Sequence, residues 1–371
     1  MNILINFVAL HGGGSLYSFE MAKAMRDNGH NVYAIISTKM ETFKDWQAEE
    51  GINIIEITGY SNKINFVFNL AKFLFFEKNK IKKIRKEVKF DLVYIPIITY
   101  WTIFVQRYLK GIRTVYTAHD VVPHDNKNRS FTNICQTKIG RNSDDIIILS
   151  KCYLDEACTR FLKAKKNVYV LPHPNCFKHE SHKMASKRYP ASFFNFIFYG
   201  QITEYKGLDI LAKAFKYVFE KRKDVSLMVA GSGDISPYIE EFRKIGCNRI
   251  TIINRWIGDE EIPELFSALK QITVLPYKNA TQSGVIPLSM HLKTPILATK
   301  CSGINEQIVD EETGFLVEPN DYVAFGDKML YLIDNWDVAV KASEKAYDYI
   351  ESMSWKNVIN IYLDAIIEGS N

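Results

Sequence analysis

The fold of this chain is decided by one stretch, NFIFYGQITEYKGLDILAKAFKYVFE, which covers residues 195–220. It opens with the apolar run 195–199 and continues through Gly200 into a short polar loop. From 207 onward, apolar residues recur at the spacing of one helix face, which predicts a helix over 207–222. A continuous apolar strand, a glycine-containing loop and a helix, in this order, are typical of a parallel sheet covered on both faces.

The same alternation of strand and helix continues on both sides of this stretch. Because the strands read as continuous apolar runs, we expect parallel sheets with both faces buried. Strands are predicted at 2–9, 31–37, 52–57, 91–97, 113–118, 145–149, 167–171, 225–230, 250–253, 271–275 and 295–298. Helices are predicted at 16–28, 63–88, 100–110, 151–163, 235–245, 260–269, 284–292, 321–335 and 337–369.

A polar, unpatterned segment at 177–192 interrupts the alternation and indicates a linker. With 371 residues the chain is long enough for two domains. We therefore predict an α/β protein with two Rossmann-like, doubly wound domains, residues 1–178 and 179–352. Ligands bind open parallel sheets at the carboxyl ends of the strands, so we expect the site in the cleft between the two domains.

The composition excludes several classes of protein. Hydrophobic residues make up 47% and charged residues 24%, which excludes a disordered or collagen-like chain. The six cysteines include no Cys-x-x-Cys pair, and we predict no metal site. No run of 18 apolar residues exists, and the first ten residues lack the basic start of a signal peptide. We expect a cytoplasmic protein with reduced thiols.

Positive charge is concentrated in residues 61–90, which hold nine basic and two acidic residues. Phenylalanines lie beside these cations, which fits docking on the anionic inner face of the cell membrane. The alternative is a helix that packs on the core, followed by a solvated basic helix. Because the charge is local, we expect no nucleic-acid partner. The predicted docking residues are Phe73, Phe75, Phe76, Lys78, Lys80, Lys82, Lys83, Arg85 and Lys86.

A glycine loop, Gly12-Gly13-Gly14, follows the first strand and precedes a helix. Glycines allow close backbone approach, and a helix N-terminus attracts phosphate. The dinucleotide-binding pattern is incomplete, because Tyr17 stands where its last glycine would be and no acidic residue follows the second strand. The loop is therefore a candidate phosphate or sugar contact, or only a tight turn.

Three further motifs follow predicted strands. His119 comes after strand 113–118 and either faces the site or is satisfied by a neighbouring backbone group. Lys206 comes after strand 195–199 and can meet a diphosphate as a compact charge, or can be a solvated lysine. Thr281 or Ser283 can cap helix 284–292, which would leave the amides of 283–285 free to bind phosphate. The alternative there is an ordinary capped helix start.

Taken together, these residues resemble the retaining glycosyltransferases of family 4, which have the two-domain GT-B fold. The resemblance covers about 130 residues of the second half in order and spacing, and the first half more loosely. It is carried by Gly200…Lys206-Gly207, Ala230-Gly231-Ser232-Gly233, Asn254-Arg255-Trp256, Leu275-Pro276-Tyr277, Gln282-Ser283-Gly284-Val285, Thr294-Pro295, Ser302-Gly303-Ile304-Asn305-Glu306 and Thr313-Gly314, and in the first half by Gly12–Gly14, Asn28–Val32, Thr117–Asp120, Ser150-Lys151 and Pro172-His173.

The resemblance implies a role for each matching position. Residues 1–178 would form the acceptor domain, joined by a crossover helix at about 353–371, and 179–352 the donor domain. Lys206 would meet the donor diphosphate, and His119 would lie beside the transferred sugar. Transfer would proceed with retention, from a UDP- or GDP-sugar, with no metal and no cofactor. The donor-binding positions would be Gly12, Gly13, Gly14, Gly200, Gln201, Lys206, Gly231, Arg255, Thr281, Gln282, Ser283, Gly284, Val285 and Ser289.

The chain departs from the family pattern at three positions. Gln201 stands where the family usually has an arginine. Thr281 and Ser289 stand where it usually has two glutamates, although a subset with Gln-Ser-Gly in this loop resembles the chain. We expect a transferase that acts on a glycan or lipid-linked saccharide in bacterial surface polysaccharide synthesis. The alternative is an inactive homologue that binds or scaffolds another transferase.

Overall fold

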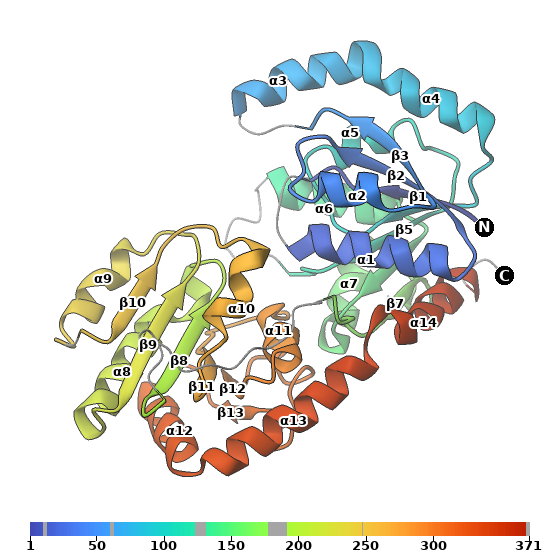
Figure 1. Ribbon diagram of the computed structural model, residues 1–371. Helices are drawn as coiled ribbons and strands as arrows, with labels where there is room; N and C mark the ends of the chain where they lie inside the picture. The colour runs from blue at the N-terminus through green and yellow to red at the C-terminus, as the bar shows by residue number, and fades with distance from the viewer. Residues whose placement is uncertain (10–12, 60–62, 123–130, 177–190, 247, 369–371) are drawn as a thin grey trace. The chain divides into compact units, whose positions relative to one another are not determined.

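The computed structural model describes residues 1–9, 13–59, 63–122, 131–176, 191–246 and 248–368. The chain divides into two compact units (Figure 1). Unit 1 comprises Met1–Cys176 and Ser354–Asn371, and unit 2 comprises Phe177–Met353. The chain therefore leaves unit 1 once and returns to it for its final helix.

Unit 1 is built on a seven-stranded parallel sheet in the order β3-β2-β1-β4-β5-β6-β7. The strand order reverses between β1 and β4, which makes this pair the topological switch point where open α/β sheets bind ligands. The inner strands are almost entirely buried, as their continuous apolar runs predict, whereas the two edge strands are partly exposed. They are β1 (Asn2–Asn6), β2 (Asn31–Ser37), β3 (Ile52–Ile57), β4 (Leu92–Ile95), β5 (Thr114–Ala118), β6 (Asp145–Ile148) and β7 (Val168–Val170).

The last helix of the chain packs in unit 1, beside α1 (Figure 1). The ring of Trp355 lies 5.2 Å from that of Tyr17, and the Tyr362 hydroxyl donates to the Pro172 carbonyl at 2.7 Å. The helices of unit 1 are α1 (Gly13–Asp27), α2 (Phe43–Ala48), α3 (Lys63–Lys72), α4 (Lys78–Glu87), α5 (Thr102–Gln106), α6 (Phe131–Asn142), α7 (Leu154–Phe161) and α14 (Trp355–Glu368).

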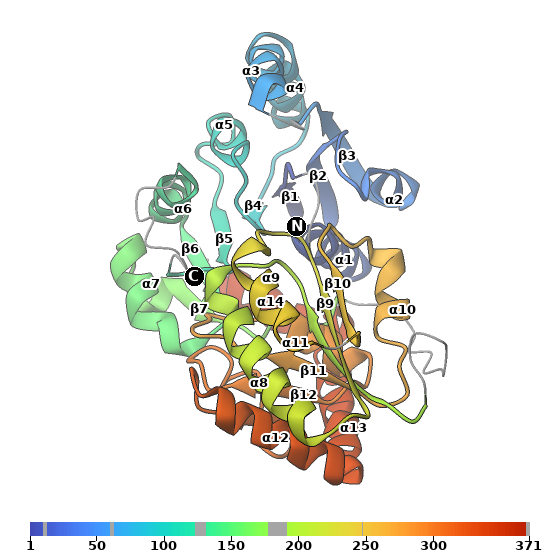
Figure 2. The ribbon, with the colours of Figure 1, turned by 90° about the vertical axis from the view of Figure 1, so that its left-hand side faces the viewer.

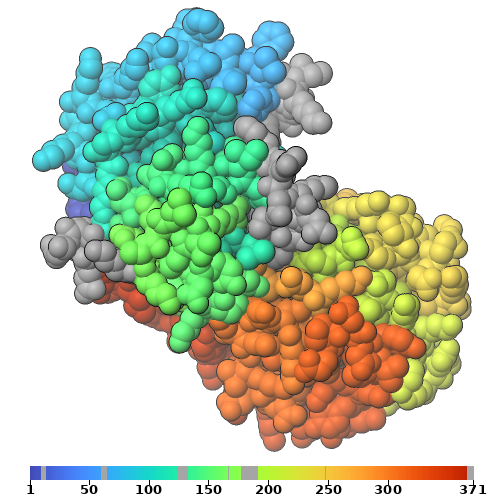
Figure 3. All heavy atoms as spheres, turned by 180° about the vertical axis from the view of Figure 1, so that it is seen from behind, coloured from blue at the N-terminus to red at the C-terminus, as the bar shows by residue number. Residues whose placement is uncertain are grey.

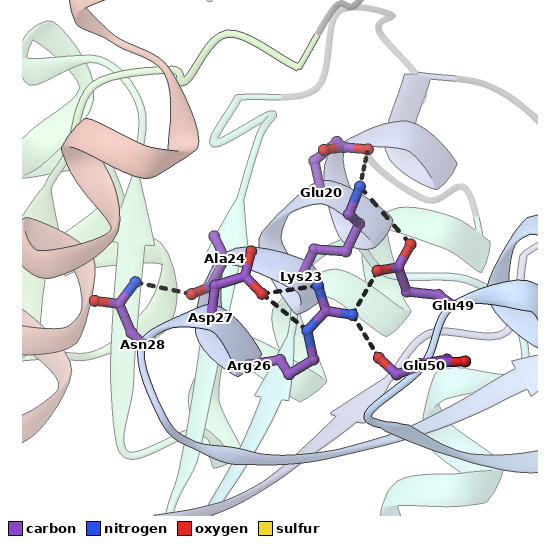
Figure 4. A network of polar contacts seen from close by, with 8 residues as sticks. All are labelled: Glu20, Lys23, Ala24, Arg26, Asp27, Asn28, Glu49 and Glu50. Carbon is purple, nitrogen blue, oxygen red and sulfur yellow. Dashed lines mark hydrogen bonds and ion pairs between the residues drawn. The ribbon is translucent and has the colours of Figure 1, made fainter.

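Arg26, near the end of α1, is held by an acidic network (Figure 4). Its guanidinium donates to the Glu49 carboxylate and the Glu50 carbonyl, both at 2.5 Å, and to Asp27. Lys23 lies 3.7 Å from the same Glu49. These contacts tie α1 to the turn before β3.

Unit 2 repeats the arrangement with a six-stranded parallel sheet in the order β10-β9-β8-β11-β12-β13. Its switch point lies between β8 and β11. The strands are β8 (Phe194–Tyr199), β9 (Val225–Ala230), β10 (Ile250–Ile253), β11 (Gln271–Leu275), β12 (Ile296–Thr299) and β13 (Phe315–Val317). The helices are α8 (Leu208–Lys221), α9 (Ser236–Arg243), α10 (Ile262–Leu265), α11 (Val285–His291), α12 (Tyr322–Asp334) and α13 (Trp336–Ser352).

The structure corrects several predicted elements. The helix predicted over 337–369 is two helices, because the chain leaves unit 2 at Met353 and Ser354 pairs with Asn175 of unit 1. Helix α6 was not predicted, because polar residues dominate it and hide its period. Strand β13 has only three residues, too few to show a pattern.

The helix predicted over 63–88 is interrupted by a π-helical turn at Phe73–Glu77 and forms α3 and α4. Figure 1 shows them as one long segment of unit 1, and Figure 2 shows the same segment nearly end-on. Phe73 is fully buried, with its ring 6.1 Å from that of Trp101 and 5.9 Å from that of Tyr108. The prediction that Phe73 docks on a membrane is therefore wrong, because this residue belongs to the core. No helix in the described part of the chain is long and apolar enough to cross a bilayer.

Candidate functional site

The switch point of unit 2 brings together loops that follow β8 and β11. Gly200 directly follows β8, with φ at 113°. A Cβ atom placed on Gly200 would lie 3.1 Å from the Lys206 ammonium nitrogen and 3.5 Å from Val285. Three of the predicted donor-binding residues therefore converge on one spot at the carboxyl edge of this sheet.

Two other glycines of unit 2 allow its loops to pack backbone against backbone. A Cβ on Gly231 would lie 1.9 Å from the Gly200 carbonyl oxygen, at a φ of 153°. A Cβ on Gly207 would lie 2.0 Å from the Pro276 carbonyl oxygen, at a φ of 69°. No other residue fits either position without moving the backbone. The glycines thus set the shape of the loop that carries Lys206.

Lys206 is the central cation of this edge. It ends the short helical turn Glu204–Lys206, which is held by a 2.7 Å hydrogen bond from the Lys278 amide to the Tyr205 carbonyl. Its ammonium nitrogen lies 5.5 Å from the centre of the Tyr277 ring. Burial lowers the pKa of Lys206. Its ammonium group forms no ion pair or hydrogen bond with any residue that the structure describes. A desolvated cation without a partner is unfavourable, so the site is suited to an anion.

The start of α11 differs from the prediction. Gln307 clamps the backbone of Ser283: its side-chain oxygen accepts from the Ser283 amide at 2.8 Å, and its side-chain nitrogen donates to the Ser283 carbonyl at 3.1 Å. The Val285 amide donates to the Ser283 hydroxyl at 3.3 Å. Two of the three amides expected to be free are therefore occupied, and α11 is only seven residues long. The sequence did not point to Gln307 beyond its place directly after Glu306.

The positions of the two family glutamates hold small, uncharged side chains. Ser289 is fully buried, and its hydroxyl lies 2.9 Å from that of Thr273 inside the core. Thr281 is almost fully buried, and its carbonyl is packed so tightly on Gly303 that a Cβ there would lie 1.6 Å from it. Ser289 is therefore placed for packing, while Gln201 is exposed and Gln282 is half-buried beside Ser283.

Arg255, the second cation predicted to bind the donor, has a carboxylate partner. Its guanidinium forms two hydrogen bonds with Glu261, at 2.7 and 2.5 Å, and a third with the Trp256 carbonyl. The pair holds the pKa of Glu261 down, at about 2. Arg255 is exposed and already neutralised, which makes it a weaker candidate than Lys206.

In unit 1 the predicted residues also meet at the switch point. A Cβ on Gly14, in the first turn of α1, would lie 2.3 Å from the side chain of Ile97, which follows β4. Gly13 begins α1, whereas Gly12 lies outside the described residues. His119 follows β5, with its ring 4.9 Å from that of Tyr17 and 6.1 Å from that of His173.

The imidazole of His119 is neutral near pH 7. Burial, and then the nearby His173, lower the pKa of His119 to about 4, and the ring hydrogen-bonds to the backbone of Pro96. Burial also lowers the pKa of His173. A neutral imidazole carries one donor and one acceptor nitrogen and so can orient a hydroxyl group.

Segment 63–87 presents an apolar and basic surface. Phe68, Phe75 and Phe76 are each more than 70% exposed, and Val67 is 68% exposed. Lys80 donates to the Glu56 carbonyl, and Lys83 lies 3.8 Å from Glu87. The other predicted docking cations form no ion pair with a described carboxylate: Lys78, Lys82, Arg85 and Lys86.

Comparison with known families agrees with this arrangement of two halves. Residues 11–174 match the model described as "Glycosyltransferase Family 4", and residues 194–335 match the one described as "Glycosyl transferases group 1". The structure also aligns with HepE from Anabaena in complex with UDP-glucose, at a TM-score of 0.70 and 18% identity over 100% of this chain and 99% of HepE. The two matches together cover most of the chain, which belongs to the GT-B glycosyltransferase family.

The names of the chain's relatives refer to different substrates. The chain is 25% identical to the capsular polysaccharide biosynthesis glycosyltransferase CapM of Staphylococcus aureus, over only 52% of each chain. It is 22% identical to a D-inositol 3-phosphate glycosyltransferase of Corynebacterium aurimucosum, over 76% of this chain and 73% of the relative. A glycosyltransferase of Rickettsia africae has a TM-score of 0.68 at 20% identity, over 100% and 98% of the two chains. These likenesses agree on the fold and the family.

Proposed function

We propose that this glycosyltransferase transfers a sugar from a nucleoside diphosphate sugar, UDP- or GDP-linked, to a saccharide acceptor. The observation that carries the proposal is Lys206, a half-buried residue whose ammonium group has no ion-pair or hydrogen-bond partner among the described residues and lies beside Gly200 and Val285 at the switch point of unit 2. A diphosphate supplies the anion that this position lacks. The solved complexes of HepE with UDP-glucose support this class of donor.

The proposed reaction retains the configuration at the transferred sugar. The bond from the anomeric carbon to the diphosphate oxygen breaks, and a bond to the acceptor oxygen forms on the same face. The acceptor proton passes to the leaving phosphate. Lys206 stabilises the charge that develops on this phosphate, and the neutral His119 orients a sugar hydroxyl. In the proposal neither a metal nor a cofactor takes part in a step.

We place the acceptor at the inner face of the cell membrane, as a lipid-linked saccharide of a surface polysaccharide. The exposed Phe68, Phe75 and Phe76 next to the lysines of α4 support peripheral docking on anionic lipid. The name of CapM supports the polysaccharide setting.

Vesicle co-sedimentation tests the docking surface. Replacing both exposed phenylalanines, Phe75→Ser and Phe76→Ser, should reduce binding to vesicles that contain phosphatidylglycerol, because two apolar contacts with the lipid are lost. The matched control is Tyr322→Ser with Tyr331→Ser on α12, where two exposed aromatic rings are removed from unit 2. Binding that ignores anionic lipid content, salt and the first pair of substitutions would contradict membrane docking.

The alternative, a scaffold without turnover, is favoured by Gln201, Thr281 and Ser289, which replace three polar contacts of the family. A thermal-shift panel of UDP, GDP, ADP, CMP, dTDP and NADH separates the two. A ligand at about 100 times its Kd adds about 2.7 kcal/mol to the free energy of unfolding. We expect one nucleoside diphosphate to stabilise the wild-type chain and not Lys206→Ala. If none of the ligands stabilises the chain, the scaffold is favoured. If NADH alone stabilises it, an oxidoreductase is favoured.

A further inference from the structure

A cavity of about 1100 Å³ opens at the opposite end of the unit 1 sheet from His119. It is lined by the first residues of two strands, Thr114 of β5 and Asp145 of β6. His119 follows the other end of β5, a strand of five residues that spans about 16 Å. The elements that line the cavity, coloured teal to green, lie on the face of unit 1 seen in Figure 3. The cavity is therefore separate from the His119 end of the sheet.

The lining of this cavity is strongly basic. Five lining residues carry a positive charge and only two carry a negative charge. The remaining polar side chains are amides and a hydroxyl, among them Asn142 and Asn167. The basic residues are Arg107, Lys110, Arg113, Lys138 and Lys163.

Both carboxylates of the lining are occupied by contacts inside unit 1. The Asp145 carboxylate is buried, pairs with Arg113 at 2.7 Å and accepts from Asn167 at 3.2 Å. The Asp144 carboxylate accepts from the Thr114 amide at 2.7 Å. The other four cations of the lining form no ion pair with any carboxylate in the described part of the chain. The cavity therefore keeps an uncompensated positive charge.

The loop that carries two of these cations is held in place from α4. The Arg85 guanidinium donates to the Tyr108 carbonyl at 2.5 Å and to the Lys110 carbonyl at 3.1 Å. Lys82 lies 5.7 Å from the centre of the Tyr108 ring. These contacts fix the backbone between Arg107 and Lys110 and add positive charge beside the rim.

We propose that this cavity binds a phosphorylated ligand with two or more negative charges, at a second site separate from the donor site. Concave walls of low dielectric concentrate the field of the lining cations. Lysine and arginine bind phosphate oxygens through charge-assisted hydrogen bonds, and the Asn142 amide can donate another. The lining is too polar for an apolar ligand. The phosphate group can belong to a soluble molecule or to a lipid headgroup.

Inorganic pyrophosphate is the probe for the test, titrated calorimetrically into the full chain. The titrations use the Lys206→Ala background, so that the proposed donor site does not contribute. The pair Lys110→Ala and Lys138→Ala should weaken binding about fivefold or more, because two exposed cation contacts are lost. The matched control, Lys44→Ala and Lys356→Ala, removes two exposed lysines of unit 1 away from the cavity. Binding that is absent, or equal in the two pairs, would overturn the proposal.

Thermal unfolding shows whether each pair of variants is folded, and all four replaced lysines are exposed.

Vesicles with and without phosphatidylglycerol then distinguish the source of the phosphate. If the cavity pair also binds these vesicles less tightly than the control pair, the ligand is a lipid headgroup. If only pyrophosphate binding weakens, the ligand is soluble. Because nucleotide binding is measured separately with intact Lys206, failure of this proposal leaves the proposed function untouched.

Discussion

Two loops at the same edge of the unit 2 sheet each carry a cation, and the two cations differ in burial and in pairing. The loop after β8 holds Lys206 half-buried, with no ion-pair or hydrogen-bond partner among the described residues. The loop after β10 holds Arg255 on the surface, bonded twice to Glu261 six residues further on. Both residues were predicted to bind the donor, Lys206 from its position after a strand and Arg255 from the family resemblance alone.

The difference shows that a cation at the carboxyl edge is not by itself a binding site. A carboxylate nearby in the chain neutralises Arg255 at little cost, because both groups stay in water. Lys206 is desolvated by the loops around it, so its charge is compensated only when an anion binds. The unpaired cation is the one that can act on a ligand.

Removing each cation in turn should give the largest contrast. Lys206→Ala should lower kcat/KM about 100-fold or more, because the leaving diphosphate loses its stabilising charge in a desolvated site. Arg255→Ala, the matched control, should change kcat/KM less than about threefold, since an exposed paired charge contributes little. Sugar transfer by the purified variants measures both. Equal losses would show that Arg255 contributes to donor binding as much as Lys206 does.

The pH dependence of nucleotide binding should also distinguish Lys206 from Arg255. Burial lowers the pKa of Lys206 in the free protein, and a bound diphosphate favours the ammonium form. Binding above the free-state pKa therefore takes up a proton, and affinity should fall by up to about tenfold per pH unit as the pH rises. Arg255→Ala should keep this profile.

Titrations of the stabilising nucleoside diphosphate between pH 7 and 10 measure the effect. Lys206→Arg is the control, because a guanidinium stays charged across this range and should give a flat profile. A wild-type profile that is equally flat would mean that the titration of Lys206 is not linked to binding.

The smallest expected effect concerns Gln307, which holds the loop facing Lys206. Gln307→Ala removes two hydrogen bonds to the Ser283 backbone and should lower the free energy of unfolding by about 1–2 kcal/mol. Urea unfolding measures this change. Glu261→Gln is the matched control on the other loop and should leave the urea midpoint nearly unchanged, because its partner is exposed. A loss as large in the control would show that the two loops are equally rigid.

Most of the fold could be predicted from local patterns. The predicted strands at 31–37, 52–57, 225–230, 250–253 and 271–275 have the bounds that the structure shows. Elements were missed where the local signal is weak, as in the polar α6 and the short β13. The apolar pattern runs across the break between α13 and α14 as one helix, because the return of the chain to unit 1 leaves no local pattern. Only the family resemblance predicted a separate crossover helix, at about 353–371.

Site residues were harder to predict than strands. The sequence pointed to the loops at both switch points, because glycines and polar residues after apolar strands are a local signal. It did not show that Arg255 has a carboxylate partner while Lys206 has none, since the surroundings of Lys206 include Tyr277 and Val285, far away in the chain. It also counted Phe73 as exposed, although the π-helical turn directs this ring to the core beside Trp101.

Two parallel α/β sheets with glycine loops at their carboxyl edges follow from the amino-acid sequence of this protein alone. Burial of continuous apolar runs is a property of each segment and can be read from it. The tertiary structure alone decided which cation lacks a partner, which phenylalanines are exposed and that Gln307 holds Ser283. These properties depend on pairs of groups from distant parts of the chain, whose solvation and bonding exist only after the sheets have packed.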